Sequence, residues 1–218
     1  MRRLIASFAL AAFLSLFAFP TADALLQDPC SLGTSFRNCR ACGTARGRRT
    51  QELNVLKNRS ESADNVDVLT IPEIRKPSNN DRFSPDTPVE VAGFVASVVR
   101  GGNRESCNCG RADLRDLHIN VVATPQERNN PKRYVIVEIT PRWQQEMGFE
   151  GGDYEAILRE AKSTFEGKWV LFQGWMLYDH IHANESQSTA PNNPANWRAT
   201  PWEVHPVTYY EILPGPPQ

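Results

Sequence analysis

Runs of β-branched and aromatic residues recur along the chain from residue 89 onward. Segments rich in Gly, Pro, Asn and Asp separate these runs, and that combination is typical of β-strands joined by turns. We therefore expect five strands, at Val89–Val99, Leu117–Ala123, Tyr134–Thr140, Trp169–Tyr178 and Trp202–Leu213.

A helix is expected between the third and fourth of these strands. Ile157, Ala161 and Phe165 recur at a spacing of four, Asp153 is placed to cap the helix start, and Gly167 can end it. The order β-β-β-α-β-β is that of an OB-fold, a five-stranded Greek-key barrel. Ligands of such barrels usually contact strands two and three and the loops after strands one and four. A small α+β sandwich with the same element order is the alternative.

The segment that precedes the first strand has a different pattern. It is polar and rich in turn residues, and it lacks sustained periodicity apart from a short possible strand at Val66–Ile71. We interpret residues 25–88 as a loop-rich arm, residues 89–213 as a mainly β barrel domain, and residues 214–218 as a tail.

The segment Met1–Ala24 has the three parts of a secretory signal peptide. Arg2 and Arg3 supply positive charge, residues 4–19 form an apolar run broken only by two serines, and small residues precede a cleavage site near Ala24. The run is shorter than the roughly 20 residues that a transmembrane helix needs. We expect the peptide to be cleaved, which leaves a secreted or periplasmic chain with no transmembrane span.

Export affects how the charge of the chain is interpreted. Without residues 1–24 the chain has a net charge of −2, and residues 88–218 alone carry −4. A strongly basic domain would indicate non-specific nucleic-acid binding, and this barrel domain is not basic. Export also argues against intracellular DNA or RNA as a partner, so we expect an extracytoplasmic ligand.

All five cysteines follow the signal peptide, and an oxidising compartment favours disulfides. Because five is odd, at least one thiol must be free, bound to something or paired with another molecule. The two cysteines after the first strand could pair with the arm, be redox-active or bind a soft metal, and four cysteines could hold zinc. We favour disulfides to the arm, although sequence does not fix the pairing. The disulfide candidates are Cys30, Cys39, Cys42, Cys107 and Cys109.

Acidic and histidine residues recur on strands that an OB barrel would bring together. Side chains two residues apart on a strand share a face, as Asp116 and His118 do. Imidazoles and carboxylates together can bind a divalent metal or perform acid-base catalysis, and they can also be structural hydrogen-bond partners. The catalytic candidates are His118, Glu138, Glu203 and His205, and the candidates for ligands of a divalent metal add Asp116 and Asp179.

Tryptophan and arginine residues occur on or near the expected loops. Such side chains can stack on nucleobases or sugars, and they can equally cap the end of a small core. The ligand-binding candidates are Arg142, His182, Trp197, Arg198 and Trp202.

Several of these segments resemble an uncharacterised family of exported bacterial OB-fold-like proteins. The resemblance covers residues 89–212 and rests on segments 105–109, 116–119, 137–142, 174–179 and 197–208. Its most specific part is Trp202–Val207, which in the family is typically Trp-Glu-Ile-His-Pro-Val, with Val204 here in place of the isoleucine. The resemblance implies the fold and the set of candidate residues, and it implies no mechanism.

Three functions fit these features. The first is an exported OB-fold binding module for an oligonucleotide or an oligosaccharide. The second is a metal-dependent hydrolase such as a phosphodiesterase, with the His/Glu set around a divalent ion. The third is a structural envelope interaction protein in which the polar set only stabilises the barrel.

Overall fold

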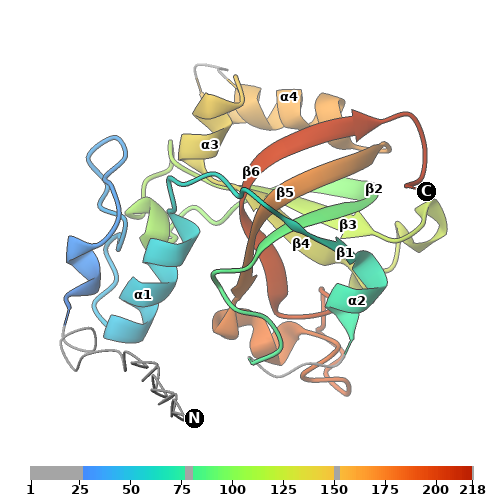
Figure 1. The fold of residues 1–218 in the computed structure, drawn as a ribbon, viewed down its shortest axis with the longest axis horizontal. Coiled ribbons are helices and arrows are strands. Elements are labelled where there is room, and N and C mark those ends of the chain that lie inside the picture. The colour runs from blue at the N-terminus through green and yellow to red at the C-terminus, as the bar shows by residue number, and fades with distance from the viewer. Residues whose placement is uncertain (1–26, 77–80, 150–152, 218) are drawn as a thin grey trace, which may run out of the picture.

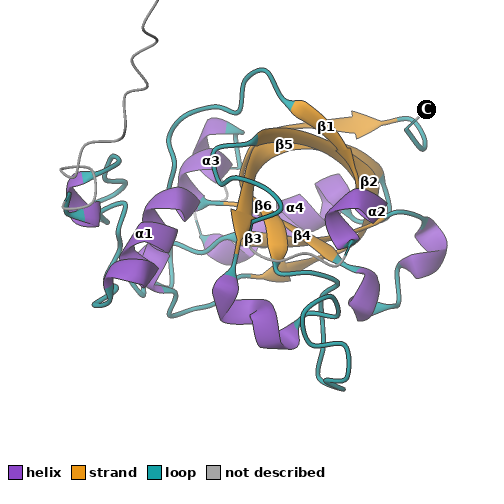
Figure 2. Ribbon diagram, turned by 60° about the horizontal axis from the view of Figure 1, so that its bottom comes forward, coloured by secondary structure: helices purple, strands orange, loops and turns teal. Residues whose placement is uncertain are grey.

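A closed β-barrel forms the body of the molecule in the computed structural model, which describes residues 27–76, 81–149 and 153–217 (Figures 1 and 2). Around the barrel the strands follow the order β2-β3-β4-β6-β5, and β5 pairs with β2 to close it. An extra strand, β1, pairs in parallel with β2. The strands are β1 (Asp67–Thr70), β2 (Pro88–Arg100), β3 (Leu117–Val122), β4 (Val135–Ile139), β5 (Trp169–Tyr178) and β6 (Trp202–Leu213).

This strand order confirms the predicted OB-fold-like barrel, and the pairing of β5 with β2 that closes it argues against the alternative, a small α+β sandwich. Neighbouring barrel strands are antiparallel except β4 and β6, which run parallel. The long strand β2 pairs with β5 through its first half and with β3 through its second half. Gly93 lies where the two halves meet, and a Cβ there would come within 2.4 Å of Cγ1 of Val121. A side chain at this position would therefore keep β2 and β3 apart.

The helices lie around the barrel, and α4 is the one predicted from sequence. Asp153 Oδ1 accepts a hydrogen bond from the Ala156 amide at 2.8 Å, and Gly167 has φ +75° after the helix end. The helices are α1 (Arg48–Lys57), α2 (Ile71–Arg75), α3 (Pro141–Glu146) and α4 (Tyr154–Phe165), and the 3-10 turns are η2 (Pro29–Ser31), η3 (Ser106–Asn108), η4 (Pro125–Glu127), η5 (Pro131–Arg133) and η6 (His180–Glu185).

One apolar core joins the barrel strands with α2 and α4. Alternate side chains of β2, such as Val89, Val91 and Val95, are fully buried in it. Helix α4 adds Leu158 and Phe165 to the same core. Complete burial of a side chain of this size stabilises a fold by about 1.5–3 kcal/mol, so the strands and α4 are held together mainly by this core.

The arm contains more regular structure than the sequence indicated. The possible strand near residues 66–71 is present as β1, and a ten-residue helix, α1, lies to one side of the barrel (Figure 1). The buried residues of α1 are Leu53, Asn54 and Lys57. Two of these three are polar, so the helix lacks the apolar periodicity by which an amphipathic helix is recognised.

Two disulfides involve the arm, and one of them attaches it to the barrel domain. Cys30–Cys42 closes a loop within the arm, and Cys39–Cys109 links the arm to the loop that follows β2. The expected bridge between that loop and the arm is thus confirmed, and Cys107 is a free, buried thiol. The described helices include none with the length and apolarity to cross a bilayer. The predicted signal peptide lies outside the described residues.

Glu127 gives the fold a testable pH dependence away from the candidate site. Arg75 Nη1 and Arg133 Nη2 lie 2.9 and 2.7 Å from its carboxylate oxygens. Burial acts to raise the pKa of Glu127, but the hydrogen bonds from Arg133 and Arg75 outweigh it and lower the pKa below its usual value. The stabilisation is therefore present above the unfolded pKa of about 4.3 and is lost as the pH falls through the folded pKa.

We expect Glu127→Gln to lower the free energy of unfolding at pH 7 by about 1–2 kcal/mol. The reason is that the Arg75 side chain, which is 8% exposed, loses its charged partner. Urea unfolding of both proteins between pH 7 and pH 3 is the measurement. The difference between them should shrink toward pH 3, and a difference that is the same at every pH would contradict this assignment.

Candidate functional site

A pocket of about 390 Å³ lies over β3 and β4, between the loop after β2, the loop after β5 and helix α1. We call it the barrel-face pocket. It occupies the face and loops at which OB-folds usually bind their ligands, since β3 and β4 are the second and third barrel strands. Its charged and aromatic lining includes Lys57, Glu105, His118, Glu138, Asp179 and Trp197.

The four catalytic candidates form one chain of contacts, in which His118 and Glu138 line the pocket and Glu203 and His205 are buried behind them. His118 pairs with Glu138 across β3 and β4, and their side chains meet at 2.8 Å between Nδ1 and Oε1. The parallel pairing of β4 with β6 brings His205 to the other side, where its Nδ1 lies 3.2 Å from Glu138 Oε2. The same nitrogen lies 3.1 Å from Glu203 Oε1. The fold thus brings together residues that are far apart in sequence.

Two buried cations complete this network. Lys57 Nζ, from α1 of the arm, lies 2.7 Å from Asp179 Oδ2 and 4.0 Å from Glu203 Oε1. Arg198 Nη2 lies 2.8 Å from Glu203 Oε2, and both of these side chains are fully buried. Asp179 and Glu203 therefore already have cationic partners. Sequence reasoning missed Lys57, because nothing in the polar arm marked one lysine as buried.

These contacts keep most of the network ionised. Although burial opposes the charged form, His205 and His118 lower the pKa of Glu138 to about 2. Burial also opposes ionisation of Glu203, but Arg198 and Lys57 hold its pKa well below the usual range. The pKa of Lys57 is raised against the effect of burial by Asp179 and Glu203. The charges are thus fixed by their partners.

Asp116 differs from the other carboxylates. Its Oδ1 accepts a hydrogen bond from Asn108 Nδ2 at 3.2 Å, but its buried Oδ2 has no hydrogen-bond partner among the described residues. The nearest ring nitrogen, His205 Nε2, is 3.8 Å away and also lacks a hydrogen bond within the described part of the chain. Burial, followed by the charge of Glu105, raises the pKa of Asp116 well above its usual value. A carboxylate in this position needs either a proton or a cation.

Buried acidic and histidine groups here could hold a metal ion. Asp116, Glu138 and His205 each offer one ligand atom, and these three atoms lie within 4.8 Å of one another. A second set with the same spacing consists of Glu105, Cys107 and Asp116. The proposed ligand Asp179, by contrast, is occupied by Lys57.

Two of the five ligand-binding candidates line the barrel-face pocket. Trp197 is half-buried and its ring lies 5.1 Å from that of His182 and 5.5 Å from that of His118, between ring centroids. Its Nε1 donates to Glu185 Oε2 at 2.9 Å, which fixes the ring orientation. Trp197 and His182 therefore form an ordered aromatic wall beside the carboxylates.

The other three candidates lie elsewhere. Trp202 is 1% exposed and packs edge-on against Phe83 and Tyr178, so it belongs to the core. Arg198 is buried in the ion-pair network. Arg142 Nη2 donates to the backbone oxygens of residues 34 and 35, which attaches the arm to α3.

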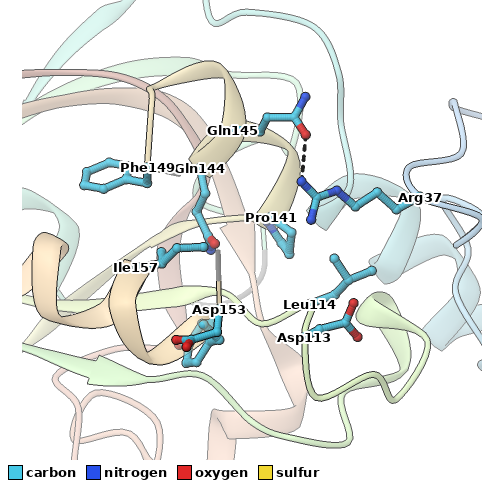
Figure 3. Close-up of a pocket in the computed structure, with 10 residues that line it drawn as sticks. Arg37, Asp113, Leu114, Pro141, Gln144, Gln145, Phe149, Asp153 and Ile157 are labelled. Carbon is cyan, nitrogen blue, oxygen red and sulfur yellow. Dashed lines mark hydrogen bonds between the residues drawn. The ribbon is translucent and has the colours of Figure 1, made fainter. Parts of the chain in front are cut away.

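A second pocket, of about 420 Å³, lies between the arm and helices α3 and α4 (Figure 3). Arg37 at its edge donates a hydrogen bond to Gln145 Oε1 at 3.0 Å. Its two carboxylates are already used, because Asp113 pairs with Arg111 and Asp153 caps α4. The residues that line this pocket include no histidine, whereas histidines and carboxylates meet at the barrel-face pocket, which remains the better candidate site.

Comparisons of the chain with models of known protein families, with curated proteins and with solved structures found no match.

Proposed function

We propose that the protein is a secreted or periplasmic binding module whose barrel-face pocket takes a short saccharide unit. The observation that carries this proposal is the position of the pocket on the β3–β4 face, between the loops that OB-folds use for ligands. A volume of about 390 Å³ is within the range of small-molecule sites. Two disulfides fit a protein that works outside a reducing cytosol.

The charge of the lining favours a saccharide over an oligonucleotide. Three lining residues carry carboxylates, Glu105, Glu138 and Asp179, against the two cations Lys57 and Arg100. Lys57 is held by Asp179 and Arg100 by Glu155, so neither cation is free to bind a phosphate. Carboxylates accept hydrogen bonds from sugar hydroxyls, whereas they repel the phosphates of a nucleic acid. Helix α1 also borders the barrel face on one side. A compact neutral ligand is therefore favoured over an extended polyanion.

Trp197 supplies the apolar surface that such a ligand needs. Its ring lines the pocket and is held by Glu185, so stacking costs little additional ordering. We expect a saccharide ligand to quench tryptophan fluorescence. Trp197→Ala should weaken its binding by about 10–100-fold, since stacking on an aromatic ring contributes about 1–3 kcal/mol.

Trp175→Ala is the matched control, because Trp175 lies on β5 outside the pocket lining and donates to the backbone oxygen of Glu61. This variant should bind with unchanged affinity. Fluorescence titration with a panel of glycans and with single-stranded oligonucleotides is the measurement. Binding of the oligonucleotides alone, or of neither class, would reject the saccharide proposal.

A metal-dependent hydrolase is the second candidate, and the unpartnered atoms of Asp116 and His205 favour it. A divalent ion bound there could lower the pKa of a bound water, and neighbouring carboxylates could accept its proton. This function depends on the ion, so the metal content of the purified protein and its response to a chelator are its first test.

Membership in the family of exported bacterial OB-fold-like proteins also remains a proposal. It is supported by the motif at Trp202–Val207, in which Glu203 and His205 belong to the buried network and Trp202 to the core. This arrangement gives the motif a physical role in joining β6 to β4, and the same residues would serve a purely structural protein of the envelope.

A further inference from the structure

Glu105 lines the barrel-face pocket, is half-buried, and is held by its own loop rather than by a cation. Its Oε1 accepts a hydrogen bond from the Gly102 amide at 2.6 Å, and its Oε2 accepts one from Cys107 Sγ at 3.5 Å. A carboxylate can accept about four hydrogen bonds, so these two leave capacity for a ligand. No basic side chain among the described residues forms an ion pair with Glu105.

The other two carboxylates of the pocket lining already have charged partners. Glu138 Oε2 lies 3.2 Å from His205 Nδ1. Asp179 Oδ2 lies 2.7 Å from Lys57 Nζ. Within the described part of the chain, Glu105 is therefore the carboxylate of this lining whose charge is not balanced by a neighbour.

We propose that the saccharide of the barrel-face pocket is an amino sugar, whose protonated amino group binds to Glu105. This inference rests on the proposed saccharide binding and names the class of saccharide. An ammonium group supplies a positive charge and three hydrogen-bond donors. It therefore suits a half-buried carboxylate that lacks a cation better than a sugar hydroxyl does, because charge-assisted hydrogen bonds are the stronger ones.

Asp116 is a second observation that points to a cation at this place. One of its oxygens lies within 4.8 Å of a Glu105 oxygen, and its buried Oδ2 has no hydrogen-bond partner among the described residues. His205 Nε2 attracts it from 3.8 Å, which is beyond hydrogen-bond distance. Two carboxyl groups this close repel each other unless one is protonated or a cation lies beside them. An ammonium group on Glu105 would relieve this repulsion.

The loop after β2 holds the Glu105 carboxylate in place before any ligand arrives. A Cβ at Gly102 would lie 2.6 Å from Glu105 Oε1, so only a glycine allows this close contact. The backbone oxygen of Glu105 accepts a hydrogen bond from the Gly110 amide at 2.9 Å. The disulfide Cys39–Cys109 fixes the same loop to the arm. Binding a cation here therefore costs little ordering of the protein.

Trp197 supplies the other half of the recognition, since its ring belongs to the same pocket lining as Glu105. The C–H face of a sugar ring packs on an aromatic ring, and a cation close to that ring is attracted by its π face. An amino sugar uses both Trp197 and Glu105. A fully hydroxylated sugar lacks the charge, and a polyamine lacks the ring.

The test is a tryptophan-fluorescence titration of the full chain at about pH 7, where an amino group with a pKa of about 8 is mainly charged. A chelator is present so that no metal ion links ligand and protein. The matched ligands are a glucosamine trimer and cellotriose, which carry an amino or a hydroxyl group at the same position of each ring. We expect the glucosamine trimer to bind about tenfold more tightly. Added salt should weaken the binding of the glucosamine trimer more than that of cellotriose.

Glu105→Gln keeps an acceptor for the Gly102 amide and removes the charge. In this variant the ratio of the two affinities should fall from about ten to about two or less. Glu160→Gln is the matched control, because it removes an exposed charge on α4 outside the pocket lining. It should keep the ratio of the unmodified chain.

Equal affinity of the unmodified chain for both trimers would overturn the amino-sugar assignment and leave saccharide binding intact, whereas binding of neither would overturn both proposals. A preference that survives Glu105→Gln would remove Glu105 from the site. Spermidine, a polyamine without a ring, is the third probe, and it would reject a sugar ligand if it bound as tightly as the glucosamine trimer. Because the ligands are compared on the unmodified chain, misfolding of a variant does not prevent the decision.

Discussion

Replacement of Arg198 by methionine is expected to lower the free energy of unfolding by about 3–5 kcal/mol, because removal of one partner from a buried ion pair leaves the other charge uncompensated. Arg198 is fully buried, and Nη2 lies 2.8 Å from Glu203 Oε2 while Nε donates to the Thr200 backbone oxygen at 2.7 Å. Methionine fills a similar volume but donates no hydrogen bond. Chemical denaturation at pH 7 is the measurement.

Arg48→Met is the matched control for this substitution. Arg48 lies 2.8 Å from Glu52 on α1, but half of each side chain is exposed, so we expect a loss below about 0.5 kcal/mol. Addition of Glu203→Gln to Arg198→Met should restore part of the stability, because the buried charge that lost its partner is removed. A loss below about 1 kcal/mol for Arg198→Met alone would show that Lys57 is sufficient to compensate Glu203.

The barrel was predictable because its strands are long and rich in β-branched residues. The expected fourth and fifth strands match β5 and β6 residue for residue, and the helix signals at Asp153 and Gly167 have the predicted roles. The proximity of Glu138 to His205 follows from the parallel pairing of β4 with β6, which is a property of the OB-fold order. The predicted fold class was therefore enough to predict that these candidate residues lie close together.

The parts that sequence did not reveal depend on contacts between distant segments. Helix α1 buries Asn54 and Lys57 rather than an apolar stripe, and this polar face is complementary to the loop and carboxylates beside it. Arginine is mostly a surface residue, and Arg198 can be buried because Thr200 and Glu203 accept its hydrogen bonds. Cysteine pairing likewise depends on how the arm folds against the barrel.

The bridge between arm and barrel leads to the other large expected effect. Cys39 and Cys109 are 70 residues apart, and removal of a disulfide that closes such a loop costs about 4 kcal/mol in the chain-entropy treatment. The double variant Cys39→Ser/Cys109→Ser should therefore be less stable by about that amount in chemical denaturation. Cys30→Ser/Cys42→Ser is the control, since its 12-residue separation gives about 3 kcal/mol.

The two disulfide variants should have similar free energies of unfolding but should differ in whether α1 stays packed against the barrel-face pocket. The Cys39–Cys109 bridge holds the arm to the loop after β2, whereas Cys30–Cys42 lies within the arm. Loss of the first bridge should free α1 from the barrel, so that Lys57 leaves Asp179 and trypsin cleaves after Arg48, Arg49 or Lys57. The control should resist this cleavage under conditions in which both variants remain folded. Equal protection of α1 in the two variants would mean that the Lys57–Asp179 contact and the packing of Leu53 hold the arm without the bridge.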